Sequence, residues 1–270
     1  KNKKTRPSRS DGCKICKGWY TLIRALIMRR YWLLRNRFFA TLAIVVSVSV
    51  GLHFFLSAIL QEIYSFSPNG ISFQTWLFPS TIHAFASILL FIIIYRDLFS
   101  HQGNVQFLKS LAISPNSKFK IILSIAISSV IECALYGLVS SLALLVILPQ
   151  FMSFTHYLSL IGYLLMYLIL LANIMITFAI IFQRLFIFLF VSTSFLFFIS
   201  AATSFLFEDQ MSSSVLSSII LNNPLTMIVF DLRALIFFGE FQVLWIILSI
   251  LISLFWLVFN AFLLKRKLKQ

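Results

Sequence analysis

Six long apolar runs dominate the sequence and restrict the folds that it can adopt. They are Phe38–Leu60, Trp76–Tyr95, Ile121–Leu148, Tyr157–Phe182, Leu185–Phe207 and Phe241–Leu264. A helix needs about 20 mostly apolar residues to cross a bilayer, and each run meets that length. We therefore expect six membrane-spanning helices, the third and fourth long enough to tilt. Pro79 falls in the first turn of the second run, where a helix tolerates proline.

The overall composition supports the same conclusion. Of the 270 residues, 60% are hydrophobic and only 11% are charged, whereas about a quarter of the residues of a soluble domain are charged. The sequence therefore predicts an all-α integral membrane protein, with one six-span transmembrane domain over residues 38–270. A basic tail and an interfacial helix in residues 1–37 precede it.

The placement of the positive charges predicts the orientation of the chain. The formal net charge of +14 would suggest nucleic acid as a partner of a soluble protein. Here the N-terminal segment, the 96–120 loop, Arg184 and the C-terminal tail carry 21 of the 22 Lys and Arg, and the 61–75 and 149–156 loops carry none. Basic residues gather on the cytoplasmic side of membranes and contact anionic lipids. We expect both termini in the cytoplasm, membrane lipids as partners and no nucleic acid.

The segment Gly18–Asn36 has the pattern of an amphipathic helix. Its apolar face comprises Trp19, Leu22, Ile23, Leu26, Leu33 and Leu34. Arg24 and Arg35 lie on the opposite face, and Arg30 interrupts the apolar stripe. Such a helix lies in the membrane interface. The alternative is a cytoplasmic extension of the first span.

The stretch Tyr95–Lys120 is the longest polar interruption between the apolar runs. Within it, Val105, Leu108, Leu111 and Ala112 are at helical spacing, and the turn signal Ser114-Pro115-Asn116-Ser117 follows. We predict a short cytoplasmic helix within Asn104–Ser114.

The segment Glu208–Glu240 lies on the outer side if there are six spans. It holds two apolar pieces, Val215–Leu221 and Thr226–Phe238, separated by Asn222-Asn223-Pro224. Each piece is too short to cross a bilayer. A re-entrant pair of half-helices before the sixth span fits this pattern, provided that protein or a watery cavity surrounds the broken backbone.

Two of these segments resemble one family of membrane proteins. The run Leu108-Lys109-Ser110-Leu111-Ala112-Ile113-Ser114-Pro115-Asn116-Ser117, followed by Phe119 to Leu123, resembles the cytoplasmic loop between spans two and three of type-2 ATP-binding-cassette (ABC) exporter permeases. Asn223-Pro224-Leu225-Thr226, followed by Asp231-Leu232-Arg233 and Gly239, is similar to the family's Asn-Pro-Leu-Thr segment before the last span. The amphipathic helix ahead of the first span also matches the family layout.

The resemblance implies a transport subunit rather than an enzyme. A second permease copy, as a homodimer, and separate cytoplasmic ABC ATPase subunits would be its partners. The sequence contains no GxxxxGK[ST] phosphate loop, so ATP and Mg are expected on the partner ATPase and no cofactor on this chain. Residues expected to couple to the ATPase are Val105, Leu108, Lys109, Leu111, Ser114, Pro115 and Ser117.

The same resemblance implies export across the bacterial cytoplasmic (inner) membrane. The cargo would be amphiphilic: a lipid-linked saccharide or polysaccharide, a lipid, or a hydrophobic drug. Residues expected in the translocation path or gate are Glu132, Asn223, Pro224, Asp231 and Arg233.

Two of these residues have competing interpretations. Glu132 lies inside the third run, and an ionisable group there is a functional candidate because its burial is expensive. It either contacts cargo or a gate, or forms a structural hydrogen bond to a neighbouring helix or dimer partner. Arg233 is the one basic residue on the expected outer side. Asp231, two positions away, would not face it on a helix, so a structural ion pair with Glu208, Asp209 or Glu240 is favoured over a role at the outer gate or with an anionic head group.

Two other functional classes are compatible with a multi-span chain. A membrane-embedded lipid-modifying enzyme needs convergent polar groups, and the spans offer only Glu132, His53 and His83. An ion-coupled secondary transporter is typically built from inverted repeats with paired broken helices. The histidines are expected to pack between helices rather than bind metal. Cys13 and Cys16 form a CxxC without the second pair that zinc needs, so they are expected to be reduced and unliganded.

Overall fold

The computed structural model describes residues 23–32, 34–63, 71–99, 117–149, 152–182, 184–205 and 222–267. After a helix over residues 23–32 come α2 (Phe38–Ile63), α3 (Phe73–Phe99), α5 (Lys118–Ile147), α6 (Phe154–Ile181), α7 (Leu185–Phe205), α9 (Pro224–Phe238) and α10 (Val243–Lys267). All regular structure in these ranges is helical.

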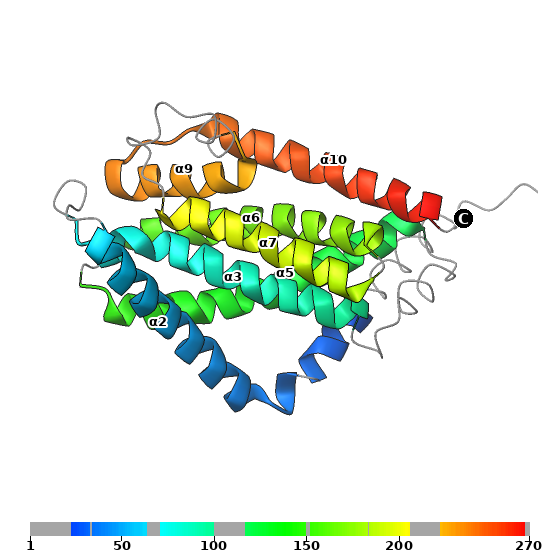
Figure 1. Ribbon diagram of the computed structural model, residues 1–270, viewed down its shortest axis with the longest axis horizontal. Helices are drawn as coiled ribbons and strands as arrows, with labels where there is room; N and C mark the ends of the chain where they lie inside the picture. Colours follow the sequence, from blue (N-terminus) through cyan, green and yellow to red (C-terminus); the bar gives the residue numbers. More distant parts are fainter. Residues whose placement is uncertain are drawn as a thin grey trace, which may run out of the picture.

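Six of the described helices are long and apolar enough to cross a membrane: α2, α3, α5, α6, α7 and α10. They coincide with the six apolar runs to within a few residues, which confirms the predicted six apolar helices. Figure 1 shows them as a bundle, with the shorter α9 at the end where α10 begins. The chain is thus an all-helical, multi-pass membrane protein.

The core of the bundle is built on α3 and α6. In the most apolar 18-residue stretches of α3 and α6, 78% and 72% of the residues are buried, against 22% in the same stretches of α2 and α10. Helix α3 packs against α2, α5, α6 and α7, while α10 packs against α5, α6 and α9. The outward faces of α2, α7 and α10 carry exposed large apolar side chains, as surfaces in contact with lipid do.

Helix α3 is longer at both ends than its apolar run predicts. It begins at Phe73 because Ser72 caps it: the Ser72 carbonyl accepts from the Trp76 amide, and its hydroxyl accepts from the Thr75 amide. Pro79 therefore lies inside the helix, so the expectation that it falls in the first turn is wrong.

At its other end α3 continues to Phe99, so Arg96 and Asp97 belong to the helix rather than to the loop predicted from residue 96. The rings of Tyr95 and Phe99 stack, and Phe99 stacks on Phe188 of α7 with centroids 4.5 Å apart. This packing stabilises one more helical turn despite the two charges.

The N-terminal helix meets α2 at a sharp bend (dark blue in Figure 1). Arg24 and Arg35 are exposed, as predicted, whereas Arg30 is buried on the face that also carries the half-buried Ile23 and Ile27. The described part of this segment, residues 23–32, is thus a helix that turns Arg30 inward, and the interfacial amphipathic helix stays a prediction. Residues 1–22, including Cys13 and Cys16, lie outside the described residues.

The second apolar piece of the 208–240 segment forms α9. The Asn223 side chain accepts from the Leu225 amide as the N-cap, Pro224 occupies the first turn, and Gly239 ends the helix with φ of 73°. A left-handed φ favours glycine at this position. The first piece, 215–221, lies outside the described residues, so the re-entrant pair stays a prediction.

Candidate functional site

The main polar feature of the described bundle is a cluster of four charged side chains, Arg30, Arg96, Asp97 and Glu132, which we call the charge cluster. Arg30 comes from the N-terminal helix, Arg96 and Asp97 from the last turns of α3, and Glu132 from the middle of α5. The cluster therefore joins three separate segments.

Arg30 is the link to the N-terminal helix. Its guanidinium donates to Glu132 Oε2 and to Ser129 Oγ, each at 3.0 Å, to the Ser128 carbonyl, and to Asp97 Oδ2. Only 8% of its side chain is exposed. The Ser129 hydroxyl and the Ser128 carbonyl thus complete the set of acceptors around this buried guanidinium.

Arg96 holds Glu132 in a fork. Its two terminal nitrogens donate to Glu132 Oε1 at 3.0 Å and to Oε2 at 2.7 Å, and its Nε lies 3.4 Å from Asp97 Oδ1. The Tyr136 hydroxyl lies 3.5 Å from Glu132 Oε1. Bidentate arginine–carboxylate pairs are the strongest class of ionic hydrogen bond. Arg96 therefore engages both oxygens of Glu132, and Arg30 also donates to Oε2.

The balance of opposite charges lowers the free-energy cost of burying the charge cluster. The cluster has two cations and two anions, so its formal charges cancel. Burial lowers the pKa of Arg30 below its usual value, while the Asp97 and Glu132 carboxylates oppose that shift. Arginine is not deprotonated in proteins, so Arg30 remains charged. The arrangement acts as a clamp between helices.

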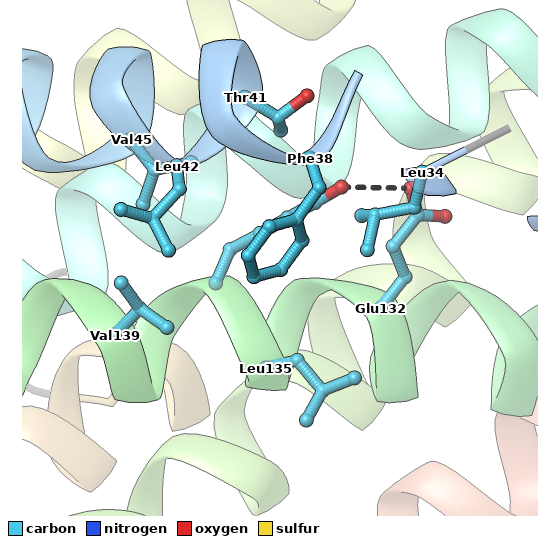
Figure 2. A pocket seen from close by; sticks show the side chains of 9 residues that line it. Leu34, Phe38, Thr41, Leu42, Val45, Glu132, Leu135 and Val139 are labelled. Atoms are coloured by element: carbon cyan, nitrogen blue, oxygen red, sulfur yellow. Dashed lines mark hydrogen bonds between the residues drawn. The ribbon is translucent and has the colours of Figure 1, made fainter. Parts of the chain in front are cut away.

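A cavity of about 210 Å³ lies beside the cluster. Figure 2 shows Leu42 and Val45 of α2 facing Val139 of α5 across it, with Glu132 nearby. Its lining comprises Leu34, Phe38, Thr41, Leu42, Val45, Glu132, Leu135, Tyr136 and Val139. Glu132 thus belongs both to the charge cluster and to the wall of an apolar cavity.

The other residues predicted for the translocation path lie elsewhere. Arg233 of α9 is 2% exposed, donates to Ser80 Oγ, and lies over the Trp76 ring at 5.1 Å. Ser80 and Arg96 are separated by 16 residues of α3, or about 24 Å along its axis. The structure therefore does not bring Glu132 together with Asn223, Pro224, Asp231 and Arg233.

Asp231 has partners of its own. Its Oδ2 accepts from the Tyr163 hydroxyl at 2.5 Å and its Oδ1 from the Gln242 amide at 3.2 Å. These bonds tie α9 to α6 and to the start of α10. Glu208 and Asp209, which were candidate partners of Arg233, lie outside the described residues.

Most of the predicted coupling segment is also outside the described residues: Val105, Leu108, Lys109, Leu111, Ser114 and Pro115. Ser117 is described, and it is the N-cap of α5, with its hydroxyl accepting from the Lys120 amide. Its cap fixes where the segment after α3 rejoins the bundle.

Sequence reasoning did not assign a second polar network, between α6 and α10. Thr177 donates to Asn260 Oδ1 at 2.6 Å, Asn260 donates to the Asn173 carbonyl at 2.9 Å, and Trp256 Nε1 donates to Thr177. The available signal was Asn173 in the fourth apolar run and Asn260 in the sixth, since polar side chains inside spans often bond across helices.

His53, His83 and the buried Cys133 pack within the bundle. His53 Nδ1 lies 3.2 Å from Thr81 Oγ1, His83 Nδ1 lies 2.7 Å from the Pro79 carbonyl, and the Cys133 thiol contacts the Ala86 carbonyl. Within the described ranges, no group of three or more His, Cys, Asp and Glu is arranged to hold a metal ion.

No family model matches the chain, and a search of curated proteins finds no match.

Proposed function

We propose that this chain is the permease subunit of an ATP-driven exporter of the type-2 ABC kind. It would move an amphiphile out of the cytoplasm across the bacterial inner membrane. Separate cytoplasmic ATPase subunits would bind ATP and Mg, and a second permease copy would complete the transport unit. The motifs at 108–123 and 223–239 are the sequence basis of this proposal.

The observation that carries the proposal is the charge cluster. Helix α3 ends at Phe99 and α5 begins at Lys118, so a force applied to the segment between them reaches both helices. The cluster ties these two helices to each other and to the N-terminal helix. A force that the cytoplasmic ATPase applies to this segment would thus move the N-terminal helix, α3 and α5 as one unit. Rigid-body switching between two arrangements proceeds in this way.

The six apolar helices of the described residues support the expected orientation, because an even number of spans brings the chain back to the side on which it began. The Lys267 ammonium donates to the Ile180 and Ile181 carbonyls, so the end of α10 lies beside the end of α6. The exposed Arg184, Lys265 and Arg266 belong to these same helix ends. In Figure 1 this end of the bundle is also the end near the N-terminal helix. Basic residues thus gather at one end, as cytoplasmic ends do.

Purification from mild detergent tests the proposal. We expect an ATPase to co-purify in roughly equal amount and to show vanadate-sensitive turnover. The variant Leu108→Asp with Leu111→Asp should lose ATPase assembly or coupling while remaining in the membrane. Gln106→Asp with Ser110→Asp is the matched control, since it adds the same charge to the opposite face of the predicted short helix.

Two outcomes would contradict the proposal. One is normal transport by the Leu108→Asp/Leu111→Asp variant. The other is chemical labelling that places Gly103 and Asn116 outside the cell. Transport that collapses with a proton ionophore but ignores vanadate would instead favour the ion-coupled class.

A further inference from the structure

The cavity between α2 and α5 has the chemistry of a hydrocarbon site. Its walls are mainly aliphatic and aromatic, with Leu42, Val45, Leu135 and Val139 on facing helices (Figure 2). Apolar cavities of about 150 Å³ stay dry and take up small hydrocarbons, and this one is about 210 Å³. Water would need two to four polar partners, whereas both carboxylate oxygens of Glu132 already accept from Arg96.

The depth of the cavity matches one leaflet of a bilayer. Its α2 wall runs from Phe38, at the start of the helix, to Val45, or about 10 Å along the axis. The hydrocarbon of one leaflet is about 15 Å deep. A lipid acyl chain that enters beside Phe38 would therefore lie along most of that depth. The exposed side chain of Leu135 marks a side of the cavity that is open to the membrane.

Positive charge lies next to this entrance. Arg35 and Arg37 are exposed and lie in sequence between the cavity residues Leu34 and Phe38. Basic side chains at the end of a span attract anionic lipid head groups. We propose that the cavity binds one acyl chain of an anionic phospholipid from the leaflet nearest the termini, with its phosphate at Arg35 and Arg37. This inference depends on the six-span arrangement and not on the exporter assignment.

Photo-crosslinking tests the acyl-chain site. The full chain is placed in nanodiscs of phosphatidylcholine containing phosphatidylglycerol with a diazirine midway along one acyl chain. Labelled peptides should map to residues 41–45 and 135–139. Val139→Phe fills the cavity and should abolish labelling at Leu42 and Val45. Val146→Phe is the matched control, because Val146 lies on the same helix, is 87% exposed and does not line the cavity.

Leu135→Trp fills the cavity from a more exposed position and serves as a second variant if Val139→Phe does not fold. Labelling that neither filling variant reduces, or that is equally strong on the outward face of α10, would mean general lipid contact and would overturn the site.

The preference for an anionic head group is tested with two arginine variants and with two further probes that carry the same diazirine chain, a phosphatidylcholine and a free fatty acid. Arg35→Gln and Arg37→Gln should each weaken phosphatidylglycerol labelling by about fivefold at equal probe concentration. Diazirine phosphatidylcholine should label weakly in the parent protein. Equal labelling by phosphatidylcholine would overturn the anionic preference, and stronger labelling by the free diazirine fatty acid would assign the cavity to that ligand instead.

Discussion

The substitution Arg30→Gln removes one cation from the charge cluster and leaves two carboxylates with Arg96 alone. Glu132 keeps both bonds to Arg96, at 3.0 and 2.7 Å. Asp97 loses its ion pair with Arg30 and keeps only a 3.4 Å contact with Arg96. Breaking a buried ion pair costs about 3–5 kcal/mol. Because the Asp97 side chain is 16% exposed, we expect about 3 kcal/mol, which is roughly a 150-fold change in an equilibrium.

Hydrogen exchange of the N-terminal helix measures this loss of free energy. Amides of residues 23–32 exchange when the N-terminal helix opens locally, so their rates report the free energy of undocking from α3 and α5. In detergent, Arg30→Gln should speed their exchange by roughly 150-fold. Arg24→Gln, on the exposed face of the same helix, should change it by about twofold at most.

A second substitution separates charge from packing. Arg30→Gln combined with Asp97→Asn restores the balance of charges, and coupled pairs of this kind recover about 0.5–3 kcal/mol. The double variant should therefore exchange more slowly than Arg30→Gln alone. Equal exchange in the Arg30→Gln and Arg24→Gln variants, or no recovery in the double variant, would refute the clamp.

Two further predictions concern helix packing, measured by thermal unfolding in detergent. Gly137→Ala places a Cβ 2.9 Å from Leu164 Cδ2, which is buried, so stability should fall by about 1 kcal/mol; Gly162→Ala meets nothing within 4 Å and should be neutral or slightly stabilising. Equal effects at the two glycines would contradict this contact. Asn260→Leu removes one acceptor of the Thr177 hydroxyl and the bond from the Asn260 amide to the Asn173 carbonyl, and it should cost about 1 kcal/mol. An unchanged unfolding temperature would mean that these bonds are not stabilising.

The spans were predictable because length and hydrophobicity decide whether a helix can cross a membrane. The ends of α3 were not, because they depend on local and tertiary partners. A serine cap starts the helix before Trp76, and ring stacking of Phe99 on Phe188 extends it past Arg96. Hydropathy reports neither contact.

The charge cluster was only half visible in the sequence. Glu132 was a candidate because a carboxylate inside an apolar run needs a partner, and Arg30 stood out as the break in an apolar stripe. Nothing in their spacing indicated that they meet, since 102 residues separate them. Arg96 and Asp97 were placed in a loop, and a loop position gives no reason to expect burial.

The balance of the charge cluster also limits how such a sequence can diverge. Losing one of its four charged side chains leaves an odd charge among packed helices, so that step would be selected against. Losing an arginine and a carboxylate together avoids this penalty. Homologous chains should therefore retain all four ionic residues or lack an opposite-signed pair of them, and lineages holding three should be rare.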